Sequence, residues 1–234
     1  MKRSVKVRGG VAALALAAAG AAAPAVAQTA LLDEGTFRIS IGGREVGTER
    51  FQIQRSGTGA QSVIIARGRV TVDAQEVTSS AQLAGETLRP AGYEVEVRGG
   101  DGQKIQGTVI GGRFSARIQS EAGENMREYL VSEGAMLADE GIAHHYYFLL
   151  QRVGSGSARV PLLIPRESRQ VSATVESGGS ETIQVGGQSV SARRVTVTPA
   201  GGAERIIWAD AQGRVLRVQV PARQYVAERT AMPG

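Results

Sequence analysis

Apolar and polar residues alternate with a period of two along most of the chain. Runs rich in valine, isoleucine and threonine are separated by glycine-rich stretches. In the first run, Phe37, Ile39 and Ile41 fall on one face. Arg38 and Ser40 fall on the other. Because successive side chains of a strand point to opposite faces, this pattern indicates antiparallel sheet with one covered face and one solvated face.

Three glycine pairs stand between neighbouring runs, at Gly42–Gly43, Gly111–Gly112 and Gly186–Gly187. Tight two-residue turns of type I′ or II′ need a positive φ, which glycine adopts because it has no Cβ to clash. Each pair therefore predicts a hairpin turn in which at least one glycine has a positive φ. A phosphate-binding role is not favoured, because no helix is expected to begin after any of the pairs.

The spacing of the runs predicts many short strands. Turn signals recur about every 8 to 12 residues, which is typical of barrels, sandwiches and curved meanders. We predict a mainly β fold, with a large curved antiparallel sheet or partial barrel in a single domain over residues 28–234. The predicted strands are 36–41, 46–55, 61–72, 76–84, 92–98, 103–110, 113–120, 125–132, 171–177, 181–185, 189–198, 203–209 and 214–220.

The segment 139–153 departs from this pattern. Its apolar residues recur at the spacing of a helical stripe, with two acids at its start and Arg152 near its end. Tyr147 and Phe148 lie opposite the stripe, so we expect a helix that is covered on both sides and packed on or in the concave face of the sheet. The domain is thus divided into a strand set over 35–132, the helix over 139–153 and a strand set over 158–230.

The first 27 residues have the layout of a secretory signal peptide. Four positive charges precede an apolar run over 11–23, and a small-residue site follows at 25–27. This layout predicts cleavage after Ala27, which leaves Gln28 as the new N-terminus. We therefore expect a protein of the periplasm, with full secretion as the alternative.

Composition argues against several classes of function. No cysteine occurs among the 234 residues, so neither a disulfide nor a thiolate ligand or nucleophile can form. Without the four leader charges the formal net charge of +5 falls to +1, which gives no electrostatic case for nucleic acid or an anionic membrane surface. No later stretch approaches the roughly 20 apolar residues of a membrane helix, so we expect no integral membrane segment in the mature chain.

The two histidines are adjacent, at His144 and His145. Neighbours on a helix point about 100° apart, whereas the ligands of a zinc helix stand four residues apart on one face. A metal site would need Asp139 and Glu140 to complete it. We therefore interpret both histidines as packing or surface residues, and we predict no metal site, no cofactor and no catalytic residue.

Aromatic residues are scarce, at 4% of the chain, yet Tyr146, Tyr147 and Phe148 are consecutive and Trp208 ends a predicted strand. Consecutive aromatic side chains point in several directions, so at least one of them can face a cavity. The alternative is that all four fill the interface between sheet and helix. These four residues are our candidates for binding an apolar ligand.

Several stretches of the chain, taken in order, look like those of one bacterial family. They are 35–48 (GTFRISIGGREVGT), Tyr146-Tyr147 with Arg152, 160–165 (VPLLIP), 206–210 (IIWAD) and 213–217 (GRVLR). In these stretches the chain resembles an uncharacterised family of exported bacterial β-rich proteins, known as a domain of unknown function. That family is similar in fold to the periplasmic lipoprotein carriers, in which a curved antiparallel sheet surrounds an apolar cavity partly plugged by helix. The resemblance implies this fold and transfers no catalytic residue.

Three hypotheses of function follow. The leading one is a non-enzymatic periplasmic protein that binds a lipid, another apolar ligand or an envelope component between the curved sheet and the helix. The second is a hydrolase of the cell envelope that uses carboxylates or His144 and His145. The third is an envelope scaffold that recruits a partner protein by strand addition at an exposed edge.

Overall fold

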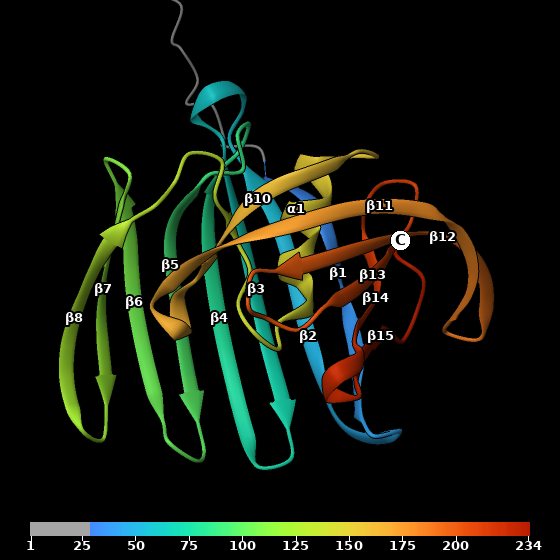
Figure 1. The fold of residues 1–234 in the computed structure, drawn as a ribbon, viewed down its shortest axis with the longest axis horizontal. Coiled ribbons are helices and arrows are strands. Elements are labelled where there is room, and N and C mark those ends of the chain that lie inside the picture. Colours follow the sequence, from blue (N-terminus) through green and yellow to red (C-terminus); the bar gives the residue numbers. More distant parts are fainter. Residues whose placement is uncertain (1–28) are drawn as a thin grey trace, which may run out of the picture.

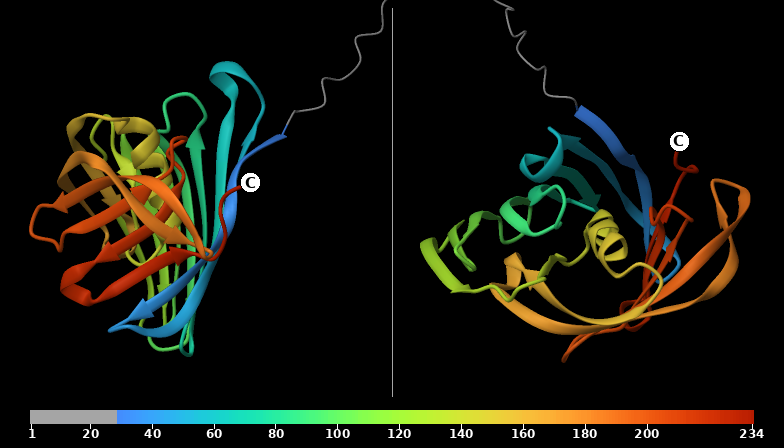
Figure 2. Two further views of the ribbon diagram at one scale, coloured as in Figure 1. Left: turned by 90° about the vertical axis from the view of Figure 1, so that its right-hand side faces the viewer. Right: turned by 90° about the horizontal axis from the view of Figure 1, so that it is seen from above.

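The computed structural model describes residues 29–234, so the predicted leader and its cleavage site lie outside the described residues. Fifteen strands form one large, curved, open sheet, and a short α-helix lies inside its curve (Figure 1 and Figure 2). The predicted mainly β fold, with a curved sheet and one helix on its concave side, is confirmed. In sheet order, β8 to β1 lead to the middle, where β1 pairs with β15, and β15 to β9 continue to the other edge.

The first eight strands form an antiparallel meander, which we call the N-terminal arm. Each strand pairs with the next one along the chain. A 3-10 turn, η1 (Gly59–Gln61), interrupts the path between the second and third strands. The strands are β1 (Thr29–Ile41), β2 (Arg44–Ser56), β3 (Val63–Val72), β4 (Gln75–Ala84), β5 (Pro90–Arg98), β6 (Gln103–Ile110), β7 (Arg113–Ser120) and β8 (Gly123–Leu130).

The other seven strands form the C-terminal arm. Pairing is antiparallel, except that β9 runs parallel to β10. Two further 3-10 turns, η3 (Pro165–Glu167) and η4 (Pro221–Arg223), connect strands of this arm. The strands are β9 (Met136–Leu137), β10 (Ser157–Ile164), β11 (Arg169–Val185), β12 (Gln188–Pro199), β13 (Arg205–Ala209), β14 (Val215–Val220) and β15 (Tyr225–Arg229).

The pairing of β1 with β15 joins the two arms, and we call it the seam. Phe37 stands opposite Arg229 in its register. Arg229 is buried, forms an ion pair with the equally buried Asp33, and places its guanidinium carbon 5.5 Å from the ring centroid of Phe37 and 5.0 Å from that of Phe51. A buried charge is tolerated when it is paired and hydrogen-bonded, and this pair satisfies that condition at the centre of the sheet.

All three predicted glycine turns are confirmed. Gly42 and Gly43 have φ of 59° and 77°, and the pairs at 111–112 and 186–187 also have two positive φ values each. The strands on either side of each pair are hydrogen-bonded to each other in the predicted antiparallel way. Two positive φ values in succession fit a type I′ turn, whose twist matches that of the flanking strands.

The helix begins later than the sequence predicts. Residues 139–142 form a loop, the 3-10 turn η2 (Ala143–His145) follows, and α1 spans Tyr146–Val153. Gly141 has a φ of 70° and Ile142 is extended, and neither conformation continues a helix. The predicted start at residue 139 is therefore wrong, because the backbone of 139–142 turns away from the helix axis.

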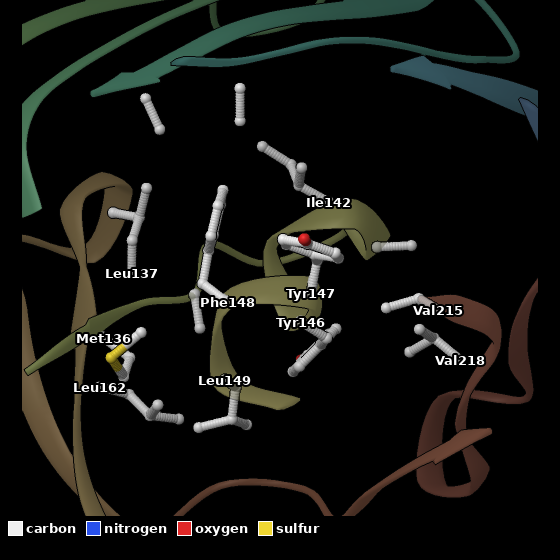
Figure 3. Close-up of a cluster of buried hydrophobic side chains, with 14 of the residues drawn as sticks. Met136, Leu137, Ile142, Tyr146, Tyr147, Phe148, Leu149, Leu162, Val215 and Val218 are labelled. Carbon is white, nitrogen blue, oxygen red and sulfur yellow. The ribbon is translucent and has the colours of Figure 1, made fainter. Parts of the chain in front are cut away.

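Both sides of α1 are covered, as predicted. Its first five residues are buried, and Figure 3 shows Phe148 directed toward the N-terminal arm and Leu149 toward the C-terminal arm. Most buried apolar side chains of both arms belong to one core around this helix. Within residues 29–234, no helix has the length and apolar character that crossing a membrane requires.

The strands differ from the prediction in a few places. β9, β10 and β15 are additional strands, and β11 is one strand with an irregularity between Ser177 and Ser180 where two strands were predicted. Ile41 was expected on the covered face with Phe37 and Ile39, but it is 44% exposed. The pairing of β1 with β15 is regular from Phe37 to Ile41, so Ile41 lies on the predicted face. Its exposure comes from its position as the last residue of β1, directly before the turn at Gly42.

Candidate functional site

Two cavities lie on either side of the loop 139–142, which we call the loop from here on. Cavity 1 has a volume of about 160 Å³ and cavity 2 a volume of about 400 Å³. Four residues line both of them, so the loop and β15 form the wall between the two spaces. The shared residues are Glu140, Gly141, Ile142 and Tyr225.

Cavity 1 is mainly apolar and has charged groups on one side only. Its apolar wall comes from β1, η2, α1, β14 and β15, which meet at the seam. The charged groups are those of Glu140 from the loop and Arg223 from η4. The apolar lining consists of Ile41, Ile142, Ala143, Tyr146, Val218, Val220 and Tyr225.

Cavity 2 lies on the other side of the loop, against the N-terminal arm. Its apolar lining comes from inward-facing residues of β1, β3 and β4. Its charged groups are of both signs and come from the loop and η3. The apolar lining is Ile39, Val70, Val72, Val77, Ile142 and Tyr225, and the charged lining is Asp139, Glu140, Arg166 and Glu167.

Three arginines hold the loop through Glu140. One carboxylate oxygen accepts a hydrogen bond from Arg205 at 2.7 Å, and the other accepts one from Arg223 at 2.7 Å. Arg166 donates to the backbone carbonyl oxygen of the same residue. The side chains of Arg205 and Glu140 are 9% and 25% exposed, so this ion pair is partly shielded from water and from salt.

Asp139, the first residue of the loop, anchors it in the core. Its carboxylate accepts a hydrogen bond of 2.6 Å from the Tyr93 hydroxyl, and Arg166 Nε lies 3.0 Å from the same oxygen. Burial raises the pKa of the Asp139 carboxyl, although Arg166 and Tyr93 oppose that shift. Burial, together with the Asp139 charge, also raises the pKa of Tyr93 well above its ordinary value.

The start of the helical segment is capped by Glu49 from β2 rather than by the acids of the loop. Its carboxylate accepts hydrogen bonds from the backbone N–H groups of Ala143 at 2.7 Å and His144 at 2.9 Å. It also lies 2.7 Å from His144 Nδ1. Glu49 and His144 are fully buried, so this carboxylate joins the helix start to β2, the strand next to the seam strand β1.

Both histidines lie in the core. The His144 ring stacks on Phe51 at a centroid distance of 5.4 Å and an interplanar angle of 2°. It also lies against the backbone of β3, since a Cβ at Gly68 would stand 2.4 Å from its Cε1. His145 Nδ1 accepts a hydrogen bond from the Asp139 backbone N–H at 3.1 Å. Burial, followed by the neighbouring charges, lowers the pKa of His145 well below its ordinary value.

The histidines have part of the geometry that a hydrolase would use, but in a closed position. Glu49 and His144 form a carboxylate–histidine pair, and the hydroxyl of Ser79 and His144 Nε2 are both buried without a hydrogen-bond partner. A substrate would have to reach side chains that are 0% exposed. Between residues 29 and 234, no group of three or more histidine, aspartate or glutamate side chains is placed to hold a metal ion.

The structure brings one of the four aromatic candidates to the cavities. Tyr146 lines cavity 1, and burial raises its pKa to about 12. Tyr147 and Phe148 pack edge to face at 5.6 Å and line neither cavity. Trp208 lies in a separate apolar cluster, where its Nε1 donates to Glu181 at 2.9 Å.

Sequence reasoning missed the charged residues of the site. Arg166, Arg205 and Arg223 lie in three separate segments, and each reaches Glu140 only through the folding of the C-terminal arm. The only local signal was Gly141, which follows Asp139-Glu140 and predicts a break in a helix. Tyr225 was missed because β15 was missed.

Fold and cavities together define a β-rich protein with an open, curved sheet around one helix. Among solved structures, the chain is similar to a β-barrel-like protein of a domain of unknown function, DUF1849, from Brucella abortus. The TM-score is 0.51 and the sequence identity 10%, over 83% of this chain and 93% of that chain. Neither a protein-family model nor a curated protein matches the sequence. At this identity the likeness concerns the fold alone, and it agrees with a β-rich domain of unknown function.

Proposed function

We propose that the protein is exported to the periplasm and there binds an apolar ligand, without catalysing a reaction, in the two cavities beside the loop. The ligand would be a lipid or another component of the cell envelope. Export is supported by the leader pattern over residues 1–27. The absence of catalysis is supported by the burial of the Glu49–His144 pair away from solvent.

One observation carries this proposal, namely two adjoining cavities inside the curve of the sheet, each with a largely apolar lining and a few charged residues. An aliphatic cavity of about 150 Å³ holds a molecule of the size of benzene, so cavity 1 has room for a short apolar chain. Cavity 2, at about 400 Å³, is within the range of small-molecule sites. The loop forms most of the wall between them, so a longer chain could occupy both cavities only if the loop moved.

The test is binding of a neutral apolar dye, N-phenyl-1-naphthylamine, to the protein obtained by expressing the full chain in a Gram-negative host. Val72→Trp places a large ring in cavity 2, whereas Thr71→Trp places the same ring on the outer face of the same strand. We expect the wild type and Thr71→Trp to bind the dye. Val72→Trp should bind about ten-fold more weakly or worse, which corresponds to about 1.4 kcal/mol.

Native mass spectrometry of the protein from the periplasmic fraction provides a second measurement. We expect a copurified apolar molecule, and we expect N-terminal sequencing to begin at Gln28. Absence of dye binding, together with a mass that shows no ligand after gentle extraction, would refute the binding proposal. A protein that stays in the cytoplasm with residues 1–27 attached would refute export.

A second candidate, strand addition, is favoured by the edge strand β8. This strand pairs only with β7 in the sheet order, and Met126 and Leu130 are 66% and 68% exposed. An exposed edge presents unpaired backbone groups that can take a strand of a partner protein. Pull-down from envelope extract tests this role, with Met126→Pro as the variant that should abolish capture because proline disrupts pairing.

A further inference from the structure

The Glu140 carboxylate lies between two arginines at the charged side of cavity 1. Its two carboxylate oxygens each accept a hydrogen bond of 2.7 Å, one from Arg205 and one from Arg223. Arg205 is almost buried, at 9% side-chain exposure, whereas Arg223 is 56% exposed. Two guanidinium groups that converge on one carboxylate form the pattern by which proteins recognise carboxylate or phosphate oxygens.

The Glu140 carboxylate lies beside the apolar lining of cavity 1. Glu140 and Arg223 line cavity 1 together with aliphatic residues of β1 and β14 and with Tyr225 of β15. A molecule with its apolar chain in this cavity and its polar end at the mouth would therefore place that end where Glu140 lies. We propose that the ligand is an anionic amphiphile whose head group replaces the Glu140 carboxylate between Arg205 and Arg223, an inference that rests on the proposed binding function.

Charge balance selects an anion over other head groups. When Glu140 moves away, two neighbours of the Arg205 guanidinium remain. One is the Ala203 carbonyl oxygen, which accepts a hydrogen bond of 2.8 Å, and the other is the Tyr146 hydroxyl. Neither carries a formal charge. An alcohol head group leaves this nearly buried guanidinium without a counter-charge, and a cationic head group repels it. A carboxylate or phosphate restores the lost pair.

The charges of the two linings favour cavity 1 over cavity 2 for an anionic head group. The charged lining of cavity 2 contains Asp139, Glu140 and Glu167 beside Arg166, so acids outnumber the base there. In cavity 1, removal of Glu140 leaves Arg223 as the only charged group in the lining.

The experiment measures displacement of N-phenyl-1-naphthylamine from the full protein by four amphiphiles with a linear chain of ten carbon atoms, counting the carboxyl carbon of the carboxylate. They are decanoate, decyl phosphate, decanol and decyltrimethylammonium. We expect both anions to bind about ten-fold more tightly than decanol, and the cation to bind more weakly than decanol. Decanoate and decyl phosphate distinguish a carboxylate from a phosphate head group.

Two variants and a control assign the effect to this site. Arg223→Gln should reduce the preference for decanoate over decanol about ten-fold. Glu140→Gln removes the internal competitor and should increase that preference. The control is Arg44→Gln, an exposed arginine on β2 that pairs with Asp73 at 3.8 Å, and it should leave the preference unchanged.

The outcomes separate the two proposals. If decanol displaces the dye as well as decanoate does, the anionic head group is refuted and the apolar site stands. Failure of the wild type to bind the dye or any of the amphiphiles refutes the proposed function and this inference together. If Arg223→Gln weakens decanoate and decanol equally, or if Glu140→Gln leaves their ratio unchanged, the head group does not occupy the place of Glu140.

Discussion

Replacement of Glu49 by glutamine is the most direct test of how the helical segment is held in the sheet. Three groups converge on its carboxylate: the backbone N–H groups of Ala143 and His144, at 2.7 and 2.9 Å, and His144 Nδ1, at 2.7 Å. The two backbone groups use different oxygens. A glutamine side chain keeps one oxygen, so one backbone N–H must face an NH₂ group whichever way the amide is turned.

The expected cost follows from this count. A buried donor left without a partner costs about 1–3 kcal/mol, and loss of negative charge at a helix start adds about 0.3–1 kcal/mol. We therefore expect Glu49→Gln to lower the free energy of unfolding by about 2–3 kcal/mol. Glu49→Ala removes all three interactions and leaves a cavity, so it should cost about 3–5 kcal/mol.

Urea unfolding followed by circular dichroism measures the effect. With a urea m-value of about 2 kcal/mol/M, the midpoint of Glu49→Gln should fall by about 1 M or more. Glu45→Gln is the matched control, because Glu45 lies on the same strand with a side chain that is 61% exposed, and its midpoint should change little. Equal midpoints for the two variants would show that Glu49 does not hold the helix start.

Three further predictions concern the turns, the core and the pH dependence of stability. Gly186→Val should lower the free energy of unfolding by more than about 1 kcal/mol, because residue 186 has a φ of 55° and an added Cβ would lie 2.7 Å from the Thr230 carbonyl oxygen. Phe148→Ala and Leu149→Ala should both destabilise, by about 3–5 and 2–5 kcal/mol, because both side chains are buried, and urea midpoints check both values. The pKa of His145 is lower in the folded state than in the unfolded state, so folding favours the neutral imidazole. The free energy of unfolding is therefore unaffected by this group above the unfolded pKa of about 6.5. As the pH falls below that value, the free energy of unfolding decreases by at most about 1.4 kcal/mol per pH unit. His145→Asn should flatten this slope between about pH 6.5 and 5 in urea titrations, and an unchanged slope would assign it to other groups.

Much of the fold could be predicted because its signals are local. The glycine pairs determine three turns, and the alternation of residues such as Phe37 and Ile39 determines which face of a strand is covered. β10 was missed because its apolar run around Pro161 does not alternate. The start of α1 was misplaced because acids at 139 and 140 fit a helix start, while the actual capping group comes from Glu49, far away along the chain.

The site was less predictable because long-range pairing builds it. Tyr146 could be singled out as an aromatic residue of an apolar helix. In contrast, nothing in the sequence near Glu140 indicates that Arg205 and Arg223 will reach its carboxylate. Arginines are frequent along the whole chain, so the sequence alone does not indicate which of them will contact Glu140. That becomes clear only when the C-terminal arm is folded.

The seam makes completion of the fold depend on β15, which is synthesised after all the other strands of the described residues. Thr230 N–H donates to the Thr36 carbonyl oxygen at 3.0 Å across almost the whole described chain. Hairpins of the N-terminal arm can form as soon as two neighbouring strands are available, whereas contacts of such sequence separation are slow to form because a long loop must close first. If the chain crosses a membrane unfolded from its N-terminus, the edge of β1 remains unpaired until β15 arrives. A chain interrupted before residue 225 would thus expose its central strand, and with it the aggregation risk of an open edge.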